Sequence, residues 1–374
     1  VKQSGHHKLF CEYDSLLGWR KVPNKIGRHI TGEYEVLESF NSKGIRGPVY
    51  PYEKNDEEYR ILILGDSFAE GYTVEFDHLF SEVLEKELNN EENQYCEVIN
   101  CGTGGYSTDQ ELLFLQTEGK KYGPDLIILL FCDNDPWYNA QPKYYRGYKP
   151  LFELKNGEMI LTNVPIPKPD TSTIKQATGE TAFFRKVKDW LNYHSYLYVF
   201  ARRRIENSFD LFSLAIKLGL AEPRNFAAFT TPEEFEVFKK SYGPKIVKAW
   251  EITERLIKKA NEEVASINSK LLIFYVPSRP SVYAEDWQAS KRKYGIADKD
   301  WDTAQVRFEL GKICKRNNID FIDPTEPFKA EARKLAANGK RLYFNEDGHW
   351  NREGHKFVGE ILARYISANY ISSF

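Results

Sequence analysis

Two short segments far apart in the chain carry the residue types of nucleophilic catalysis. Ser67 follows a Gly-Asp pair, and a second acid, Asp347, stands two positions before His349. A serine hydroxyl becomes an effective nucleophile when a histidine takes its proton and a carboxylate holds the other ring nitrogen. These residues therefore predict acyl transfer through Ser67, with His349 as general base and Asp347 as the acid that orients it.

Two further segments could stabilise the negative oxygen that forms in such a reaction. The loop 101–106 contains three glycines, which let the backbone approach a ligand closely and expose an N–H group. Asn134 follows the most apolar run of the chain, where its side-chain amide could donate to an oxyanion. Each segment also fits an ordinary turn. A dinucleotide-binding loop is disfavoured, because the spacing is G-x-G-G and no acidic residue closes a following strand.

The histidine segment permits two other interpretations. Asp347, His349 and His355 could bind a metal, although the two histidines lack the i,i+4 spacing of a helical pair. His355 could instead pack as an ordinary helix residue. Gly-Asp-Ser alone is a weak signal, since Asp and Ser are common N-cap residues. The joint occurrence of nucleophile, base, acid and amide donors favours catalysis, and that chemistry requires no cofactor and no metal.

The segments that must position these residues alternate between short apolar runs and helical patterns. Strands are predicted at 59–64, 96–100, 125–131, 270–276 and 319–322, and helices at 78–90, 109–121, 304–317, 326–337 and 353–369. This alternation predicts a mainly parallel sheet with helices on both faces. Three of the chemical segments directly follow a strand. Because parallel strands bind ligands beyond their carboxyl ends, these segments are expected to be neighbours in space.

The order of these predicted elements also indicates how the chain is divided into an arm, a domain and an insertion. Residues 1–58 indicate an irregular N-terminal arm that packs on the core, and residues 59–374 a single α/β domain with a mostly helical insertion or cap at 136–268. Aromatic side chains of the insertion suit sugar rings or acyl chains, or else form its own core. They are Tyr144, Tyr145, Tyr148, Phe152, Trp190, Tyr193, Tyr196 and Tyr198. Trp350, next to the predicted base, is the expected pocket-lining residue.

Composition excludes several function classes. The formal net charge of -2 gives no global field that would favour nucleic acid. No run approaches about 18 apolar residues, so no membrane span is predicted. The five cysteines form no C-x-x-C pair, which favours buried free thiols over a zinc site.

The cellular location is not determined by these features. The chain starts at Val1, so a signal peptide or anchor could precede it; the scattered cysteines equally allow a cytoplasmic location. Compartment and oligomeric state stay open.

The chemical segments resemble the four blocks of the SGNH (GDSL) hydrolase family. The matching residues are Ser67 in ILGDSF, Gly105 in VINCGTGGYST, Asn134 in FCDND, and Asp347 with His349 in DGHWN. The matched blocks bracket residues 59–135 and 270–370. Two arm segments, LGWRKVPN and NSKGIRG, are similar to a large bacterial subset often associated with cell-surface carbohydrate. That subset includes polysaccharide O-acyl esterases and acyltransferases.

The resemblance implies a flavodoxin-like three-layer α/β/α fold and a serine esterase that works through an acyl-enzyme. It implies an oxyanion hole built from the backbone N–H groups of Ser67 and Gly105 and the side chain of Asn134. No nucleic acid and no cofactor enter this chemistry. The expected partner is a small-molecule or glycan acyl ester.

Two departures from the family pattern affect the site. The usual last block is Asp-x-x-His, and Glu346 stands at that spacing as a rival to Asp347. Related polysaccharide-modifying proteins use Asp-x-His, which favours Asp347. In addition, Asp133 occupies a position where the family often has Gly, and it is expected to point away from the oxyanion.

Three functions fit these observations. The first is an esterase that removes acetyl or another small acyl group from a carbohydrate. The second is an O-acyltransferase in which a sugar hydroxyl replaces water. These two share the acyl-enzyme, so the sequence does not separate them. The third is a non-catalytic carbohydrate-binding module on a decayed scaffold, which the intact set of chemical residues disfavours.

Overall fold

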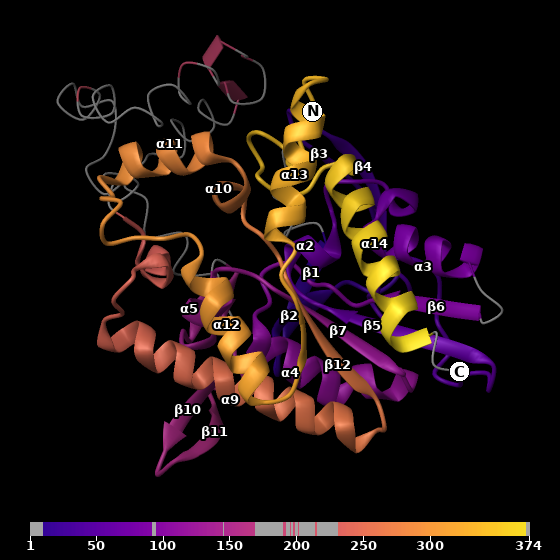
Figure 1. Ribbon diagram of the computed structural model, residues 1–374. Helices are drawn as coiled ribbons and strands as arrows, with labels where there is room; N and C mark the ends of the chain where they lie inside the picture. Colours follow the sequence, from indigo (N-terminus) through magenta and orange to yellow (C-terminus); the bar gives the residue numbers. More distant parts are fainter. Residues whose placement is uncertain are drawn as a thin grey trace.

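A five-stranded parallel sheet forms the centre of the molecule (Figure 1). The computed structural model describes residues 10–91, 95–144, 146–168 and 231–371, with a few positions between 190 and 214. In sheet order the strands are β13 (Asp320–Ile322), β12 (Lys270–Tyr275), β7 (Leu126–Phe131), β5 (Glu58–Leu64) and β6 (Tyr95–Asn100). Counted along the chain, this is the 2-1-3-4-5 order of flavodoxin-like folds. The predicted fold class is confirmed.

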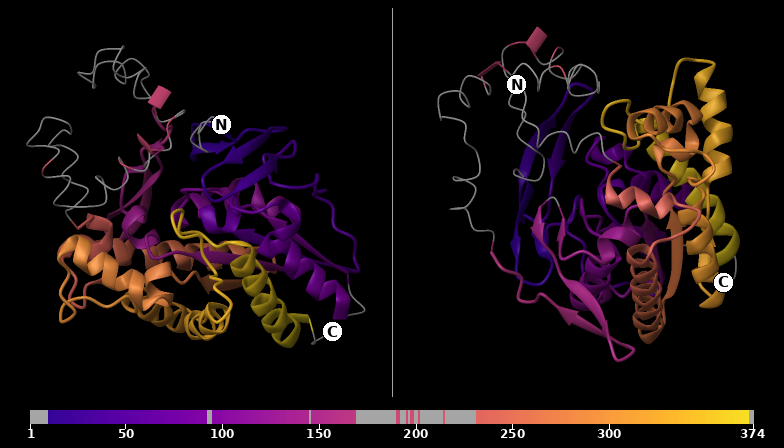
Figure 2. Two further views of the ribbon diagram at one scale, coloured as in Figure 1. Left: turned by 90° about the horizontal axis from the view of Figure 1, so that it is seen from above. Right: turned by 90° about the vertical axis from the view of Figure 1, so that its left-hand side faces the viewer.

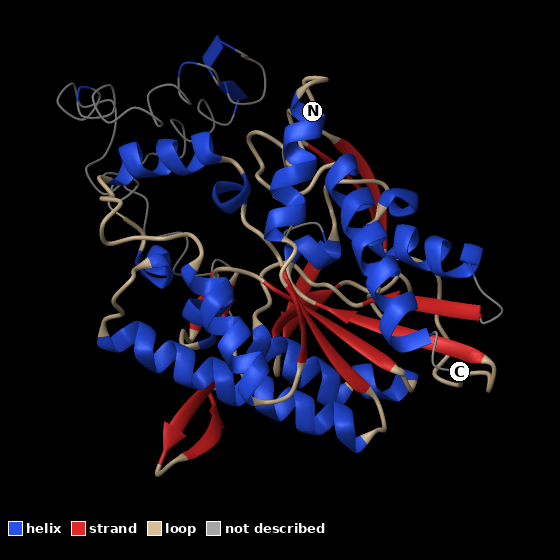
Figure 3. Ribbon diagram, in the orientation of Figure 1, coloured by secondary structure: helices blue, strands red, loops and turns tan. Residues whose placement is uncertain are grey.

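Helices cover both faces of this sheet (Figure 3). One face packs against α4 (Thr108–Thr117), α9 (Pro244–Ser266) and α12 (Gln305–Arg316), and the other against α3 (Phe80–Glu91), α13 (Thr325–Ala336) and α14 (Arg352–Ile366). Along β5, Leu62 and Leu64 belong to the first core and Ile61 and Ile63 to the second, because successive strand residues point to opposite faces. This double burial explains the continuous apolar runs of the sequence.

The sequence explains why a helix forms directly after the predicted base. Asn351 caps α14, since its side-chain oxygen accepts the N–H groups of Glu353 at 3.0 Å and Gly354 at 3.2 Å. Val358 and Leu362 lie four residues apart on the helix and are fully buried against the sheet. The cap and the buried face together hold the preceding loop at a defined place.

The N-terminal arm is regular rather than irregular, which corrects the sequence-based expectation. Its described residues, 10–58, form two antiparallel ribbons: β1 (Cys11–Asp14) pairs with β2 (Gly18–Lys21), and β3 (Ile26–Ile30) with β4 (Glu35–Ser39). These strands of four or five residues are too short to give a strong periodic signal. Trp19 packs in the core that contains α4. Buried Arg46 donates hydrogen bonds to the carbonyl groups of Gly71 and Val74, both at 2.7 Å.

The described residues of the predicted insertion form two different parts. Its beginning contains α5 (Asp135–Asn139) and two hairpins, β8 (Lys143–Tyr144) with β9 (Gly147–Tyr148) and β10 (Leu151–Lys155) with β11 (Glu158–Thr162). Its end, α9, is a layer helix of the sheet, so the boundary at 268 was placed too late. A parallel crossover from β7 to β12 requires such a covering helix. Residues 169–189 and most of 190–230 lie outside the described residues.

After β12 the chain forms two further helices, α10 (Arg279–Val282) and α11 (Ala284–Tyr294).

All five cysteines lie in the described ranges and are free thiols, four of them buried. Across these same ranges, no helix combines the length and the apolar character needed to cross a membrane.

Buried His355 makes a testable contribution to stability. Burial, with smaller contributions from Arg46 and His349, lowers the pKa of His355 to about 3. The Phe80 N–H lies 3.3 Å from Nδ1 of His355, which accepts it only when neutral. Below the ordinary histidine pKa of about 6.5, the unfolded chain binds a proton that the folded chain does not. Stability is therefore lost as the pH falls from about 6.5 towards 3.

We expect His355→Gln to remove this pH dependence. Between pH 7.5 and pH 5 the free energy of unfolding of the wild type should fall by about 2 kcal/mol more than that of the variant. Urea unfolding at the two pH values measures this difference. Equal pH dependence in both proteins would show that His355 does not resist protonation in the folded state.

Candidate active site

The predicted site residues lie beyond the carboxyl ends of adjacent strands. Ser67 follows β5 and Asn134 follows β7, and these two strands pair in parallel with Leu64 opposite Leu129. The chain order of the strands reverses direction at β5, because β6 lies on one side of it and β7 on the other. Such a switch point opens a crevice in which doubly wound folds bind ligands.

A tight turn carries Ser67 from β5 into α2 (Ser67–Glu70). A side chain at Gly65 would place its Cβ only 2.8 Å from Ala69 Cβ and 2.9 Å from Leu130 Cβ, so the close packing requires glycine. Asp66 caps the turn, accepting the Phe68 N–H at 2.8 Å. The positive N-terminal end of α2 adds little electrostatic stabilisation at Ser67, since α2 has only four residues.

The structure brings Ser67, His349 and Asp347 together. Ser67 Oγ lies 2.7 Å from His349 Nε2, and His349 Nδ1 lies 2.6 Å from Asp347 Oδ1. The Phe68 ring packs against the imidazole with a centroid distance of 4.5 Å. The side chains of His349 and Asp347 are 22% and 20% exposed, so a substrate can reach the imidazole from solvent.

The ionisation state of Asp347 determines which ring nitrogen of His349 carries the proton. Burial opposes ionisation of its carboxyl group, but the hydrogen bonds and charge of His349 and the hydrogen bond from Tyr34 outweigh it and lower the pKa of Asp347 to about 2. An ionised carboxylate only accepts hydrogen bonds, so Nδ1 of His349 carries the proton. Nε2 is then the acceptor for the Ser67 hydroxyl. This is the arrangement in which a histidine can remove the proton of a serine.

The structure also distinguishes between the rival acids. Asp347, at Asp-x-His spacing, contacts the imidazole, whereas Glu346 is exposed. Asp133 is buried and its Oδ1 accepts the hydroxyl of Tyr275 at 2.6 Å. Burial raises the pKa of Asp133 to about 6. Its carboxyl group is thus engaged by the neighbouring strand β12.

The three predicted oxyanion donors follow the ends of β5, β6 and β7. They are the backbone N–H groups of Ser67 and Gly105 and the side-chain amide of Asn134. In the described part of the chain none of the three has a hydrogen-bond partner, unlike the Gly104 N–H, which donates to Glu70 at 2.6 Å. A side chain on Gly104 would lie 3.6 Å from Ser67 Cβ, which shows how closely this loop approaches the serine.

Two residues of the histidine segment have structural roles. Trp350 is fully buried and packs against Phe68, Phe80 and Phe328, so the prediction that it lines the pocket is wrong. A strand-like bridge from Trp350 to Tyr343 turns its side chain into the core. His355 also packs in the core, as the helix alternative predicted. Within the described ranges, no cluster of three or more His, Cys, Asp or Glu side chains is arranged to hold a metal ion.

Sequence reasoning missed three residues around the triad. Tyr34 of the arm donates to Asp347 Oδ2 at 2.8 Å, and Tyr72 Oη lies 3.3 Å from both oxygens of the same carboxylate. Glu33 accepts the backbone N–H of Asp347 at 2.8 Å. Burial and the adjacent Asp347 raise the pKa of Tyr34, which keeps its hydroxyl a donor. No motif marks these residues, because their contacts span about three hundred positions of sequence.

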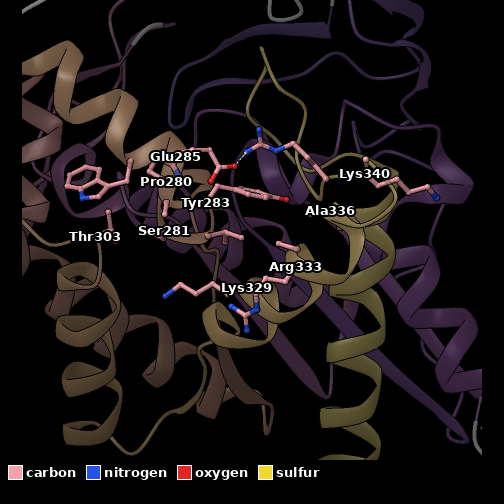
Figure 4. A pocket seen from close by; sticks show the side chains of 15 residues that line it. Pro280, Ser281, Tyr283, Glu285, Thr303, Lys329, Arg333, Ala336 and Lys340 are labelled. Carbon is pink, nitrogen blue, oxygen red and sulfur yellow. Dashed lines mark ion pairs between the residues drawn. The ribbon is translucent and has the colours of Figure 1, made fainter.

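A separate cavity of about 700 Å³ lies between α10, α11 and α13 (Figure 4). Tyr283 and Trp287 contribute aromatic surface, and Lys329, Arg333 and Lys340 contribute positive charge. None of the predicted site residues lines it. Its cations are largely neutralised by neighbours, as in the pair of Lys340 with Glu353.

The aromatic residues expected to form a cap are only partly within the described ranges. Phe152 is buried in the core, and Tyr144 packs on Tyr138 with ring centroids 3.8 Å apart. Tyr148 and Trp190 are exposed. Tyr145, Tyr193 and Tyr196 lie outside the described residues.

Comparison with solved structures finds an acetyl xylan esterase and two lipolytic proteins at low sequence identity. An acetyl xylan esterase, AlAXEase, is 13% identical, with 83% of this chain and 99% of that chain covered at a TM-score of 0.43. A lipase/acylhydrolase from Enterococcus faecalis is 10% identical, with coverages of 83% and 96% and a TM-score of 0.40. A member of the lipolytic G-D-S-L family from Veillonella parvula is 12% identical, with coverages of 84% and 98% and a TM-score of 0.36. The search of curated proteins finds no match.

A family model matches the carboxy-terminal part of the chain directly. Residues 244–373 match the family described as SGNH hydrolase-like domain, acetyltransferase AlgX. The matched range contains Asp347 and His349, whereas Ser67 lies upstream of it. The match supports an enzyme that hydrolyses acyl esters or transfers acyl groups. Residues 244–373 are thus similar to the SGNH hydrolase-like domain family, the same family that the sequence blocks resemble.

Proposed function

We propose that the protein is a serine esterase that removes acetyl or another small acyl group from a carbohydrate through an acyl-enzyme at Ser67. The observation that carries this proposal is the chain of two short contacts, from Ser67 Oγ to His349 Nε2 at 2.7 Å and from His349 Nδ1 to Asp347 Oδ1 at 2.6 Å. An ionised acid, a correctly protonated imidazole and a serine hydroxyl are the three parts that acyl transfer needs.

The reaction follows from these positions. Ser67 Oγ attacks the acyl carbon while its proton passes to His349 Nε2, and Asp347 stabilises the resulting imidazolium. The amide donors of Ser67, Gly105 and Asn134 are suited to hold the oxyanion, where one such donor is worth about 3–4 kcal/mol of the barrier. The leaving alcohol takes the proton from His349. A water molecule then attacks the acyl-enzyme, with His349 again as base.

The proposed identity of the acyl group and that of the alcohol are supported by different observations. The family match to an acetyltransferase supports acetyl as the acyl group. The arm segments that resemble cell-surface carbohydrate enzymes support a glycan as the alcohol. Nothing in the triad requires water as the acceptor. An O-acyltransferase that delivers the acyl group to a glycan hydroxyl is therefore the second candidate, and the acetyltransferase match favours it specifically.

The partition of the acyl group separates the two candidates. The full chain is incubated with p-nitrophenyl acetate, and release of p-nitrophenol and of free acetate is followed with and without an added oligosaccharide acceptor. For an esterase we expect equal release of both products, unchanged by the acceptor. For a transferase we expect acetate release to fall and acetylated oligosaccharide to appear. If p-nitrophenol release does not exceed that of a heat-denatured sample, both candidates are wrong.

A further inference from the structure

The turn between β3 and β4 in the N-terminal arm reaches the loop that carries the triad acid. Glu33 accepts three consecutive backbone N–H groups of that loop, from Asn345 at 2.8 Å, Glu346 at 3.0 Å and Asp347 at 2.8 Å. Figure 2 shows the loop before α14 extending towards the arm strands. A single carboxylate that binds three N–H groups in a row fixes the path of the backbone.

The next residue holds the side chain of the same acid. Tyr34 Oη donates to Asp347 Oδ2 at 2.8 Å, while Oδ1 of this carboxylate faces His349. Rotation of the carboxylate out of the imidazole plane would break the bond to Tyr34. Each oxygen therefore has one short contact of its own, besides the longer contact of both with Tyr72, and the arm supplies one of these short contacts.

Tyr34 is itself held firmly. Its backbone N–H donates to Thr31 Oγ1 at 3.1 Å, which closes the turn. Its ring packs on Phe344 with a centroid distance of 5.0 Å and on His29 at 5.3 Å. His29 in turn lies 3.9 Å from the buried carboxylate of Glu38. These contacts preorganise the hydroxyl before any substrate binds.

We propose that Glu33 and Tyr34 are positioning residues for the triad, an inference that rests on the proposed function. The arm is then part of the catalytic apparatus, although it lies outside the sheet and outside the range that matches the family model. A merely structural arm would lose stability when these residues change, with no specific dependence on Asp347. The positioning role instead acts on catalysis through Asp347.

The test uses single substitutions in the full chain, one of which removes a hydroxyl group and the other a negative charge. Tyr34→Phe removes the bond to Asp347 and keeps the packed ring, and Glu33→Gln removes the charge that holds the loop. In each we expect kcat to fall about 10- to 100-fold, the equivalent of one hydrogen bond to a charged group, with KM unchanged. Tyr13→Phe and Glu35→Gln are the controls, since these arm residues bond to Ile166 and Arg28. Both controls should keep wild-type kcat.

A double-mutant cycle separates positioning from general destabilisation. In an Asp347→Asn background, Tyr34→Phe should cause no further loss, because the carboxylate that it orients is already absent. Fluorophosphonate labelling of Ser67 gives a second readout that needs no ester substrate. Wild-type labelling rates in both single variants, or a full additional loss in the Asp347→Asn background, would overturn the inference. If Ser67→Ala is labelled as fast as the wild type, the proposed function itself fails.

Discussion

Replacing Ser67 with alanine is expected to lower ester hydrolysis by about 10⁴- to 10⁶-fold without unfolding the protein. The substitution removes the only atom that forms the acyl bond. It disturbs little else, because Ser67 Oγ contacts His349 at 2.7 Å and Asp66 at 3.4 Å and is only partly buried. The rate of p-nitrophenol release, measured beside the thermal midpoint, checks both parts of this prediction.

Ser266→Ala is the matched control for this variant. Ser266 lies at the end of α9, is exposed and donates only to the carbonyl of Glu263 at 2.6 Å. It should keep wild-type turnover. A Ser67→Ala protein that is folded and as active as the wild type would refute serine catalysis at this site.

The second large effect concerns the acid that holds the imidazole. Asp347→Asn is expected to lower kcat by about 10⁴-fold, the effect known for the corresponding change in serine proteases. An amide in this place can donate its N–H to Nδ1 of His349 and so favour the tautomer with its proton on Nε2. That tautomer cannot accept the proton of Ser67. The rate of acyl-enzyme formation in a stopped-flow burst experiment measures the loss.

Glu346→Gln provides the discriminating comparison, since Glu346 stands at the spacing usual for the family. Its side chain is exposed and Asp347 Oδ1 is the oxygen 2.6 Å from His349 Nδ1, so this variant should keep its burst rate. If Glu346→Gln loses activity and Asp347→Asn keeps it, the orienting acid has been assigned to the wrong residue.

Much of the fold could be predicted because its signals are local. The buried strand β5 reads as a run of apolar residues, and α14 shows both a capping Asn351 and apolar residues four positions apart. Alternation of such elements allows few topologies other than a parallel doubly wound sheet. The residues that follow the strand ends were then expected to be neighbours. His349 follows no strand, and the structure places it in contact with Ser67 across 282 positions.

The errors concern features that depend on packing between distant segments. Trp350 was expected in the pocket, yet it is buried among Phe80 and Phe328, because the side of a loop that faces the core depends on the path of the backbone. The layer helix α9 was assigned to the insertion, since amphipathic spacing does not tell which surface a helix covers. The arm strands were missed because such short ribbons gain stability mainly from the surface on which they pack.

The sequence by itself determined the chemical groups and the succession of strands and helices along the chain, because residue type, turn chemistry and hydrophobic period are properties of short segments. Only the tertiary structure decided that Asp347 rather than Glu346 meets the imidazole, and that Glu33 and Tyr34 of the arm hold this acid. The physical reason is that a hydrogen bond requires atoms to be placed within a few tenths of an ångström. Such precision comes from the packing of the whole chain and cannot be predicted from any one segment.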